Sequence, residues 1–466
     1  MATPSEIISA MREAAPPGQQ RLDDGVLGEL RSLTQALIAA RPDAGEEYAR
    51  FLALGWRGIA VPEAELAGWL GGATVLVTGG TGCIGSTLMA QIARLRPARL
   101  VSVSRGVTSG WPGADGAEYF HADIRDASGL GAVLADVRPD VVFHLAAQRD
   151  PGLAECEVHR TVTTNVLGTR NVIAAAEEAA VSRLVFASTG KALRPYSREV
   201  YTASKRAAEW LVAEAARRGA VTCAAARFTH VIDNSIIHRR LLGWCNGGVI
   251  RLHAADILFY AQSALESAQL LLTAGVSAAS GELWAHAITD LGWPVSLLDL
   301  ALGVVARTGS EAPVYFSGYD PGYESKPFPG LYDPLTAGEV SPLLSAFEAA
   351  GVQQVPGRVT DAFPLLFAPR EELGASLLAV QDACAAGDDA ALRAAASQGF
   401  DRHGAQPRLF RRRRRRRSPF RLGACPSRED RRSGHSSADR QDFGRPAAHR
   451  KYRALPPGRD GDDPHA

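Results

Sequence analysis

A tyrosine and a lysine stand four residues apart in the run YTASK, at Tyr201 and Lys205. On a helix this spacing places the two side chains on one face, one turn apart. A phenol with its ordinary pKa of about 10 is a weak base at neutral pH, and a neighbouring ammonium group favours the deprotonated form. The pair therefore predicts a catalytic tyrosine that exchanges a proton with a substrate hydroxyl or carbonyl group.

Polar side chains that precede this pair are candidates to assist it. Ser188 or Thr189 can orient the reacting oxygen, and Lys191 is a candidate acid or base, with a surface lysine in a loop as the alternative. The chain holds only four lysines among its 51 Lys and Arg residues, which favours a function because arginine does not release its proton at neutral pH. Asn165 is a candidate to organise a water relay, or else a buried structural asparagine.

A glycine-rich run, TGGTGCIGS, follows an apolar segment directly and opens an expected helix. In that context Gly79 permits a tight turn, Gly82 lets the backbone approach a pyrophosphate, and Gly85 lets helix and strand pack closely. The free amide groups at the start of the helix favour a negative charge there. The run predicts a dinucleotide site, whose expected residues are Gly79, Thr81, Gly82, Cys83, Ile84 and Gly85.

The end of the second expected strand selects between the two nicotinamide dinucleotides. An acidic residue there would hydrogen-bond the ribose hydroxyl groups of NAD, whereas this chain has Ser104 and Arg105. Because a guanidinium group suits a 2′-phosphate, the sequence favours NADP, with NAD as the alternative. The other interpretation of Arg105 is a solvated turn residue.

Later strand ends complete the predicted cofactor site. Asp123 is placed to accept a hydrogen bond from the adenine amino group, and Ile124 to pack on the ring. Ala146 and Ala147 are small enough for the backbone to pass close to the cofactor. Lys205 is expected to hold the nicotinamide ribose as well as to assist the tyrosine.

Short apolar segments alternate with amphipathic helical segments from residue 73 onward. Nearly continuous apolar strands indicate a sheet buried on both faces, so we predict an α/β fold with a Rossmann-type doubly wound parallel sheet. His144, at the end of a strand, is expected to be a hydrogen-bonded structural histidine. The expected strands are Thr74–Val77, Leu100–Val103, Tyr119–Ala122, Val141–Leu145, Arg183–Ala187 and Thr222–Arg227, and the main helices are 83–95, 163–179 and 202–217.

The pattern divides the chain into five parts. Apolar residues at helical spacing predict a helical N-terminal extension that packs on the main domain or on a partner subunit. Weaker strand–helix alternation after residue 233 predicts a smaller, mixed substrate-side region of the same extended domain. The expected parts are 1–70 (extension), 71–233 (Rossmann domain with the catalytic residues), 234–370 (substrate side), 371–400 (terminal helices) and 401–466 (a disordered, Arg-rich tail).

The net charge of +1 conceals an uneven distribution. Residues 401–466 hold 19 Lys and Arg against 8 Asp and Glu, which leaves 32 against 42 in residues 1–400. The acidic body argues against nucleic-acid binding, and the run Arg411–Arg417 is expected to be a solvated tail or a reading-frame artefact, with nucleic acid or an anionic membrane surface as alternatives. The N-terminal composition, the lack of a long apolar run and the scattered cysteines predict a cytoplasmic protein without a membrane span, a metal site or a disulfide framework.

In their order and spacing, TGGTGCIG, DIRD, HLAA, STGKA and YTASK resemble the extended short-chain dehydrogenase/reductase superfamily. Within it, the chain is most similar to the CapD-like polysaccharide biosynthesis family of nucleotide-sugar epimerases and dehydratases, as QRDP at 148–151 and TNVLGT at 164–169 also indicate. The resemblance implies an NAD(P)-dependent enzyme that oxidises a sugar 4-hydroxyl through the Tyr–Lys pair, after which epimerisation, elimination or reduction follows. It also implies a homo-oligomer that pairs through helices 163–179 and 202–217.

Three positions depart from that family's pattern. Gly190 stands where the family's dehydratases carry an aspartate, so a 4,6-elimination lacks its expected acid. Leu258 and Asp320 stand where the resemblance implies arginines that contact phosphate. The candidates to replace those arginines are Arg239, Arg240 and Arg251. The alternative functions are an NADP-dependent ketoreductase or dehydrogenase of another small molecule, and a cofactor-binding protein without turnover.

Overall fold

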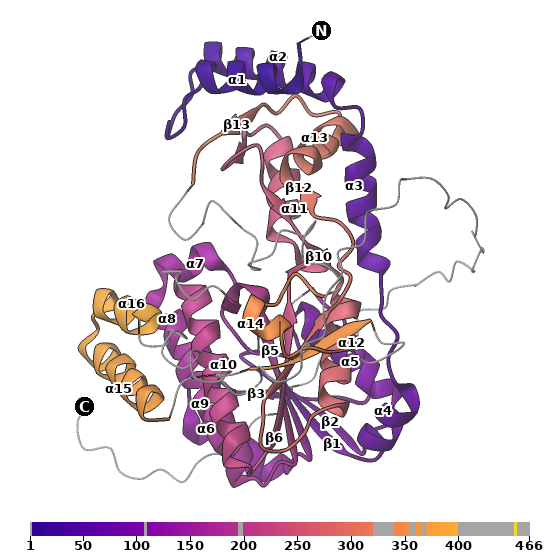
Figure 1. Ribbon diagram of the computed structural model, residues 1–466, viewed down its shortest axis with the longest axis vertical. Helices are drawn as coiled ribbons and strands as arrows, with labels where there is room; N and C mark the ends of the chain where they lie inside the picture. Colours follow the sequence, from indigo (N-terminus) through magenta and orange to yellow (C-terminus); the bar gives the residue numbers. More distant parts are fainter. Residues whose placement is uncertain are drawn as a thin grey trace, which may run out of the picture.

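One large sheet forms the centre of the lower part of the molecule (Figure 1). The computed structural model describes residues 2–106, 110–193, 199–319, 340–354, 359–365, 367, 370–398 and 452–453. Six parallel strands lie in the order β3-β2-β1-β4-β5-β6, which is the Rossmann arrangement and confirms the predicted fold class. These strands are β1 (Thr74–Thr78), β2 (Arg99–Ser104), β3 (Glu118–His121), β4 (Val141–His144), β5 (Arg183–Thr189) and β6 (Thr222–Phe228).

Helices pack on this sheet close to where the sequence predicts them, with one exception. The expected helix 163–179 is interrupted, because residues Thr163–Leu167 form a π-helical turn, η2, between two α-helices. Such turns are rare and occur often at functional sites. The helices are α5 (Cys83–Arg94), α6 (Ala127–Val137), α7 (Pro151–Cys156), α8 (Val158–Val162), α9 (Gly168–Glu178), η3 (Gly190–Leu193), α10 (Val200–Arg218) and α12 (Ala264–Val276).

Segments from the later part of the chain extend the sheet at both edges. Strand β11 (Trp284–Ile288) adds in parallel to β6, and β15 (Thr360–Pro364) pairs with β11 in antiparallel orientation. Part of the expected substrate-side region therefore belongs to the main sheet. The remaining elements here are α14 (Ala346–Ala349), β14 (Gln353–Gln354) and β16 (Tyr452–Arg453), which pairs with β3. Apart from β16, the predicted tail 401–466, including Arg411–Arg417, lies outside the described residues.

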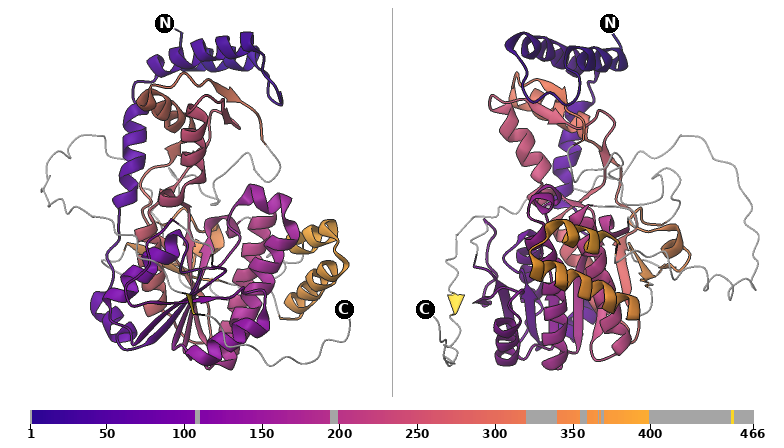
Figure 2. Two further views of the ribbon diagram at one scale, coloured as in Figure 1. Left: turned by 180° about the vertical axis from the view of Figure 1, so that it is seen from behind. Right: turned by 90° about the vertical axis from the view of Figure 1, so that its left-hand side faces the viewer.

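Above the sheet lies an upper region with an apolar core of its own (Figures 1 and 2). The first three helices pack there on residues 232–316, whereas α4 buries Leu66 and Leu70 in the core of the sheet. Of the helices of the N-terminal extension, α4 thus packs on the core of the main domain, as expected. The elements are α1 (Pro4–Ala14), α2 (Asp24–Ala40), α3 (Ala44–Ala53), η1 (Leu54–Trp56), α4 (Glu63–Leu70), β7 (His230–Val231), η4 (Ile232–Asn234), α11 (Ile236–Cys245), β8 (Ile250–Leu252), β9 (Leu258–Phe259), β10 (Ala261–Gln262), β12 (Val295–Ser296), α13 (Leu297–Thr308) and β13 (Val314–Phe316).

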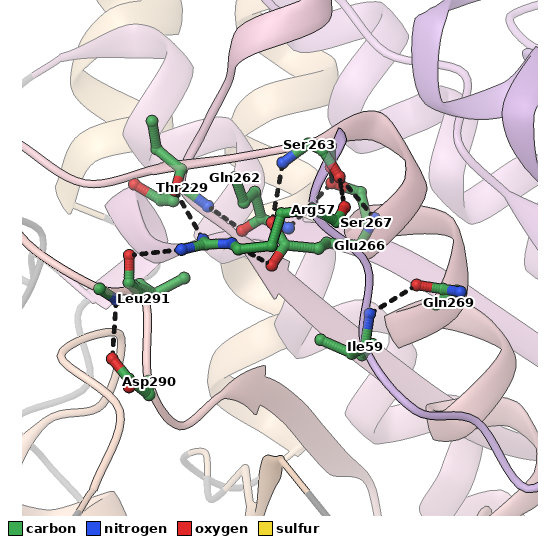
Figure 3. Close-up of polar contacts among 12 residues, drawn as sticks. Arg57, Ile59, Thr229, Gln262, Ser263, Glu266, Ser267, Gln269, Asp290 and Leu291 are labelled. Carbon is green, nitrogen blue, oxygen red and sulfur yellow. Dashed lines mark hydrogen bonds and ion pairs between the residues drawn. The ribbon is translucent and has the colours of Figure 1, made fainter. Parts of the chain in front are cut away.

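A half-buried arginine joins the upper region to the sheet (Figure 3). The guanidinium of Arg57, in the segment between η1 and α4, donates to Glu266 at 2.5 Å and to the carbonyl oxygens of Leu291 and Ala261 at 3.2 Å. Its own carbonyl oxygen accepts from the hydroxyl of Ser263 at 2.5 Å. Since only 2% of the Glu266 side chain is exposed, Arg57 satisfies a carboxylate that would otherwise be buried without a cation.

Two C-terminal helices, α15 (Arg370–Ala386) and α16 (Asp389–Gln398), pack against α8 and α10. Arg206 of α10 donates to the carbonyl oxygen of Ser397 at 3.1 Å, and Arg393 bonds Glu155. Every described residue of α10 from 202 to 216 is buried within the single chain. The chain itself therefore covers this part of α10, and the expected pairing of subunits through this helix stays a prediction.

In the part of the chain that the structure describes, no helix is both long and apolar enough to cross a membrane.

Candidate functional site

The glycine-rich turn has the close backbone contacts that its sequence requires. Gly79 adopts a positive φ of 77°, and a Cβ atom there would lie 2.9 Å from the backbone nitrogen of Ala146. A Cβ atom on Gly85 would lie 2.1 Å from the carbonyl oxygen of Gly79. Gly82 forms the N-cap of α5, so the turn and the free amide groups of Cys83 and the residues after it face the same edge of the sheet. The turn and the helix start together fit a pyrophosphate.

The end of β2 carries polar groups that suit the adenosine half of a dinucleotide. The hydroxyl of Ser104 is buried without a hydrogen-bond partner in the protein, and Arg105 beside it is exposed. Burial raises the pKa of Asp123, but hydrogen bonds from Arg125 and the charges of Arg125 and Arg105 outweigh it and lower the pKa below its ordinary value. Arg105 therefore lies near the predicted adenine site rather than in a remote turn.

Other predicted cofactor residues line the same edge of the sheet. Arg125 occupies both carboxylate oxygens of Asp123, with distances of 2.6 to 3.0 Å, so this arginine must yield if Asp123 is to accept from adenine. Ile124 is buried under α9, where a Cβ atom on Gly168 would lie 2.7 Å from its Cδ1 atom. Ala146 and Ala147 are half-buried after β4, and Thr81 and Ile84 lie in the turn and at the start of α5.

Tyr201 meets Thr189 where β5 ends and α10 begins. The side chain of Thr189 lies close enough to the phenol of Tyr201 to affect its pKa, and Tyr201 is half-buried. Burial raises the pKa of Tyr201 to about 12, while the Thr189 side chain and the charge of Arg149 oppose the rise and the carboxylate of Glu199 adds to it. The expectation of a lowered tyrosine pKa is thus wrong for the protein without ligands, because the cost of burying a phenolate outweighs the nearby positive charge.

Ser188 is directed away from this pair. Successive side chains of a strand point to opposite faces, so Ser188 and Thr189 cannot both face Tyr201. The Ser188 hydroxyl donates to Glu209 at 2.6 Å, and Arg227 bonds Glu209 and Glu348 at 2.8 to 2.9 Å in a network of buried charges. The structure therefore favours Thr189 for orienting a reacting oxygen, and gives Ser188 a structural role.

Lys205 lies at the base of the same site. Its ammonium group donates to the carbonyl oxygen of Ala187 at 2.7 Å and lies 4.2 Å from the centre of the Phe186 ring. Burial lowers the pKa of Lys205 to about 7, although the carboxylate of Glu209 opposes the shift. The side chain is thus held beside the end of β5, where it can reach a ligand that also contacts Tyr201.

Lys191 has a partner that sequence reasoning missed. Its ammonium group bonds Glu199 at 2.6 Å, and only 2% of the Glu199 side chain is exposed. Glu199 also accepts from the hydroxyl of Thr202, and its charge reaches Tyr201. Lys191 is therefore more than a surface lysine in a loop, because it pairs with a buried carboxylate. The available signal was a carboxylate two residues before Tyr201.

Two further polar side chains are fully engaged in the protein. Asn165, within the π-helical turn, donates to the carbonyl oxygen of Gln148 and to the hydroxyl of Ser204 at 2.9 Å and accepts from the Gln148 amide at 2.8 Å. These contacts match the structural alternative for Asn165, and the water relay stays a prediction. His144 bonds the hydroxyls of Thr78 and Thr169 at 2.7 and 3.0 Å, which confirms its structural role.

A cavity of about 440 Å³ opens between the sheet and the upper region. It is lined by Gln148, Arg149, Asp150, Leu153, Ile236, Arg239 and Arg240, and we call it the arginine cavity. A larger cavity of about 550 Å³ lies between α2 and α13. Its lining includes none of Thr189, Tyr201 and Lys205.

Only some of the arginines expected to replace the missing phosphate contacts line the arginine cavity. Arg239 and Arg240 line it, whereas Arg251 donates to the carbonyl oxygens of Gln19 and Gln20 at 3.3 Å and holds the N-terminal segment instead. Leu258 is partly exposed on β9 and does not line the cavity. Asp320, Pro321 and Gly322 lie outside the described residues, so the expected loss of a phosphate contact at Asp320 stays a prediction.

Comparisons with known proteins agree with this geometry. The sequence profile of the family described as "Polysaccharide biosynthesis protein" matches residues 75–324. The capsular polysaccharide biosynthesis protein CapD of Staphylococcus aureus is 29% identical over 265 residues, which cover 53% of this chain and 43% of that protein. A UDP-N-acetylglucosamine 4,6-dehydratase (inverting) of Campylobacter jejuni is 33% identical over 143 residues, which cover 29% of this chain and 42% of the enzyme.

The chain thus spans less than half the length of these relatives. Among solved structures, Pen from Bacillus thuringiensis superposes with a TM-score of 0.53 at 22% identity, over 65% of this chain and 89% of that one. That likeness supports the fold.

Proposed function

Because the chain belongs to the polysaccharide biosynthesis protein family of the extended short-chain dehydrogenases/reductases, we propose that it modifies a nucleotide-linked sugar by transient oxidation at C4. The observation that carries this proposal is the contact between Tyr201 and Thr189 at the sheet edge where the glycine turn also lies. Two hydroxyl groups that meet beside a dinucleotide site are suited to hold one reacting oxygen.

Tyr201 would exchange the proton of the substrate oxygen. With a pKa of about 12 the phenol is protonated at neutral pH, which suits proton donation to a carbonyl oxygen. In the oxidative direction the phenol must first lose its proton, and the charge of Arg149 lowers the cost of that step. Thr189 would fix the oxygen against the phenol, and Lys205 would hold the ribose next to it.

The residues of the turn fit a nicotinamide dinucleotide, which when bound accepts a hydride from the sugar and returns it. A Cβ atom on Gly79 or Gly85 would clash with neighbouring backbone, so glycine at these positions lets the turn stay tight enough to approach a pyrophosphate. The unpartnered, buried hydroxyl of Ser104 suits a polar ligand. We propose NADP as the preferred cofactor because Arg105, next to Ser104, supplies a cation where NAD would need an acceptor.

The fate of the oxidised sugar depends on the groups around Gly190. A 4-ketone makes the C5 proton acidic, so either elimination or epimerisation can follow. Gly190 offers no acid for a leaving hydroxyl, but Lys191 beside it is held by Glu199 at 2.6 Å. This lysine is the remaining candidate to donate or accept a proton near C5 and C6, and Glu199 would orient it.

The proposal is tested by following UDP-glucose and UDP-N-acetylglucosamine in deuterated water with the full-length protein. We expect a keto product, an epimer or deuterium at C5, detected by mass spectrometry and NMR. Tyr201→Phe should lower the rate by about 10² to 10⁴, the usual value of a positioned proton transfer. Tyr119→Phe, which removes a phenol that accepts from Ala114 elsewhere in the sheet region, is the matched control. A Tyr201→Phe variant as active as the wild type would contradict the mechanism.

Gly190 favours one second candidate, a net ketoreductase of another small molecule. In that case the nicotinamide absorbance would change steadily with substrate, because the cofactor would not be regenerated in each cycle. Steady oxidation of NADPH by a carbonyl substrate, without conversion of any nucleotide sugar, would establish that alternative.

A further inference from the structure

Three arginines from two distant parts of the chain line the arginine cavity. Arg149 lies in the loop between β4 and α7, on the sheet, whereas Arg239 and Arg240 lie on α11 in the upper region. All three side chains are exposed. Within the residues that the structure describes, the guanidinium groups of Arg149 and Arg240 form no hydrogen bond or ion pair, and that of Arg239 bonds only the side-chain oxygen of Asn234, at 2.8 Å.

The cavity therefore gathers a net positive charge, because its lining holds three arginines and one carboxylate. Its one carboxylate, Asp150, already serves as the N-cap of α7 and accepts from the Leu153 amide at 3.2 Å. Like charges that converge on one cavity repel one another, and a bound anion with several oxygens removes that cost. Guanidinium groups are also the side chains whose planar, forked donors match phosphate oxygens.

The same cavity adjoins the predicted chemistry. The charge of Arg149 reaches the phenol of Tyr201, and both Arg149 and Arg239 reach Cys83, the first residue of α5 after the glycine turn. A ligand in the cavity would thus lie within electrostatic reach of Tyr201 and of the start of α5. A volume of about 440 Å³ is within the range of small-molecule sites, roughly 300 to 1,000 Å³.

We propose that the arginine cavity binds the diphosphate of the substrate, with Arg149 on one side and Arg239 and Arg240 on the other. This assignment rests on the proposed function, which supplies a nucleotide-linked sugar. It explains how the chain can dispense with the arginine that Leu258 replaces on β9: the positive charge has moved to helix α11 and to the loop before α7.

The N-terminal extension holds α11 in place for this role. His238, which precedes the arginine pair, bonds the hydroxyl of Tyr48 on α3 at 2.9 Å, and the ring of Phe51 packs edge-on against it at 5.8 Å. Tyr48 and Phe51 are both buried in the upper core. The N-terminal helices therefore act as the support that fixes the substrate side of the cavity.

The experiment is a calorimetric titration of the full-length protein with UDP, in the absence and presence of saturating NADPH. NADPH separates the two possible sources of phosphate binding, because it fills the glycine turn and leaves the arginine cavity open. We expect UDP to bind in both conditions. Replacing Arg239 and Arg240 together by glutamine should weaken UDP binding by at least about tenfold, and Arg149→Gln by a similar factor, because charge-assisted hydrogen bonds to phosphate are lost.

Arg31→Gln is the matched control, since Arg31 is an exposed arginine that lines the other cavity. It should leave the UDP affinity unchanged within about twofold, as surface substitutions normally do. The proposal is overturned if the α11 double variant binds UDP as tightly as the wild type, or if NADPH alone abolishes UDP binding. Turnover of UDP-sugars by the wild type, measured in parallel, tests the proposed function separately: turnover with unchanged UDP binding in the variants rejects only the diphosphate assignment.

Discussion

The sheet region and the upper region differ in how each would recognise its ligand. In the sheet region the backbone would bind the ligand: Gly79 and Gly85 allow a tight turn in which any side chain would clash with neighbouring backbone, and the start of α5 presents amide groups. In the upper region side chains do the work, because Arg239 and Arg240 project from a helix into an open cavity. The predicted cofactor site thus depends on backbone geometry, whereas the arginine cavity depends on charged side chains.

The two regions also have separate apolar cores, and each core supports one of the two predicted binding sites. The core of the sheet supports the turn, the tyrosine and the lysine, while the core formed by the N-terminal helices and residues 232–316 supports α11. Under the proposed function, the reacting oxygen of the substrate would lie between the two regions. The proposal therefore requires that the contacts of Arg57 hold the two regions together and that each region binds a different ligand.

The largest expected effect on stability comes from removing the Arg57 contacts between the two regions. Arg57→Ala leaves Glu266 buried without its cation, and breaking such a pair usually costs about 3 to 5 kcal/mol. Since 26% of the Arg57 side chain is exposed, we expect the lower end, about 3 kcal/mol off the free energy of unfolding. Urea unfolding followed by circular dichroism measures this change.

Arg41→Ala is the control for that variant. Arg41 also pairs across elements, with Asp299 at 2.7 Å, but the pair lies within the upper region and is more exposed. Its loss should cost less than about 1 kcal/mol. If the two variants lose equal stability, Arg57 is not the special link between the regions.

The next effect concerns a charge that only the sheet region buries. The folded-state pKa of Lys205, about 7, lies below its ordinary value of 10.5, so between these pH values the unfolded chain binds more protons and wild-type stability rises with pH. Lys205→Met removes the buried charge. We expect the variant to be more stable than the wild type at pH 6, by an amount on the order of 2 kcal/mol, with the advantage shrinking by pH 10.

Thermal unfolding of both proteins at pH 6, 8 and 10 measures that difference. An advantage that is independent of pH would mean that packing, and not the buried charge, separates the two proteins.

The smallest effect tests the backbone character of the cofactor site. Gly79→Ala places a Cβ atom 2.9 Å from the Ala146 nitrogen and should weaken NADPH binding by at least about tenfold, which is 1.4 kcal/mol. Gly72→Ala is matched to it, because Gly72 has a φ of 75° and no atom within 4 Å of a built Cβ atom. NADPH fluorescence titration should show normal affinity for Gly72→Ala, and equal losses in both variants would point to backbone strain alone.

Much of the sheet region could be predicted from the sequence because its constraints are local. The glycine turn and the YTASK run each place their chemistry within one strand, one turn or one helix, where spacing decides geometry. Alternation along β5 decides between Ser188 and Thr189, but only once it is known which face of the strand meets Tyr201. The raised pKa of Tyr201 was not predictable, because burial depends on the whole fold.

The upper region was less predictable because its contacts are distant in sequence. Nothing in the local pattern joins Tyr48 to His238 or places Arg149 and Arg239 around one cavity, and both arrangements exist only after the helices pack. The same reason explains why the packing of α16 on α10 was not predicted. Local motifs thus indicated the cofactor side, whereas the substrate side required the tertiary structure.

The most direct test of this division is a pair of titrations on two variants. Gly79→Ala and the Arg239→Gln/Arg240→Gln double variant are each titrated with NADPH and with UDP. The account predicts opposite results: the glycine variant loses NADPH affinity and keeps UDP affinity, while the arginine variant keeps NADPH affinity and loses UDP affinity. If either variant weakens both ligands equally, the two regions do not bind separate ligands and the account is wrong.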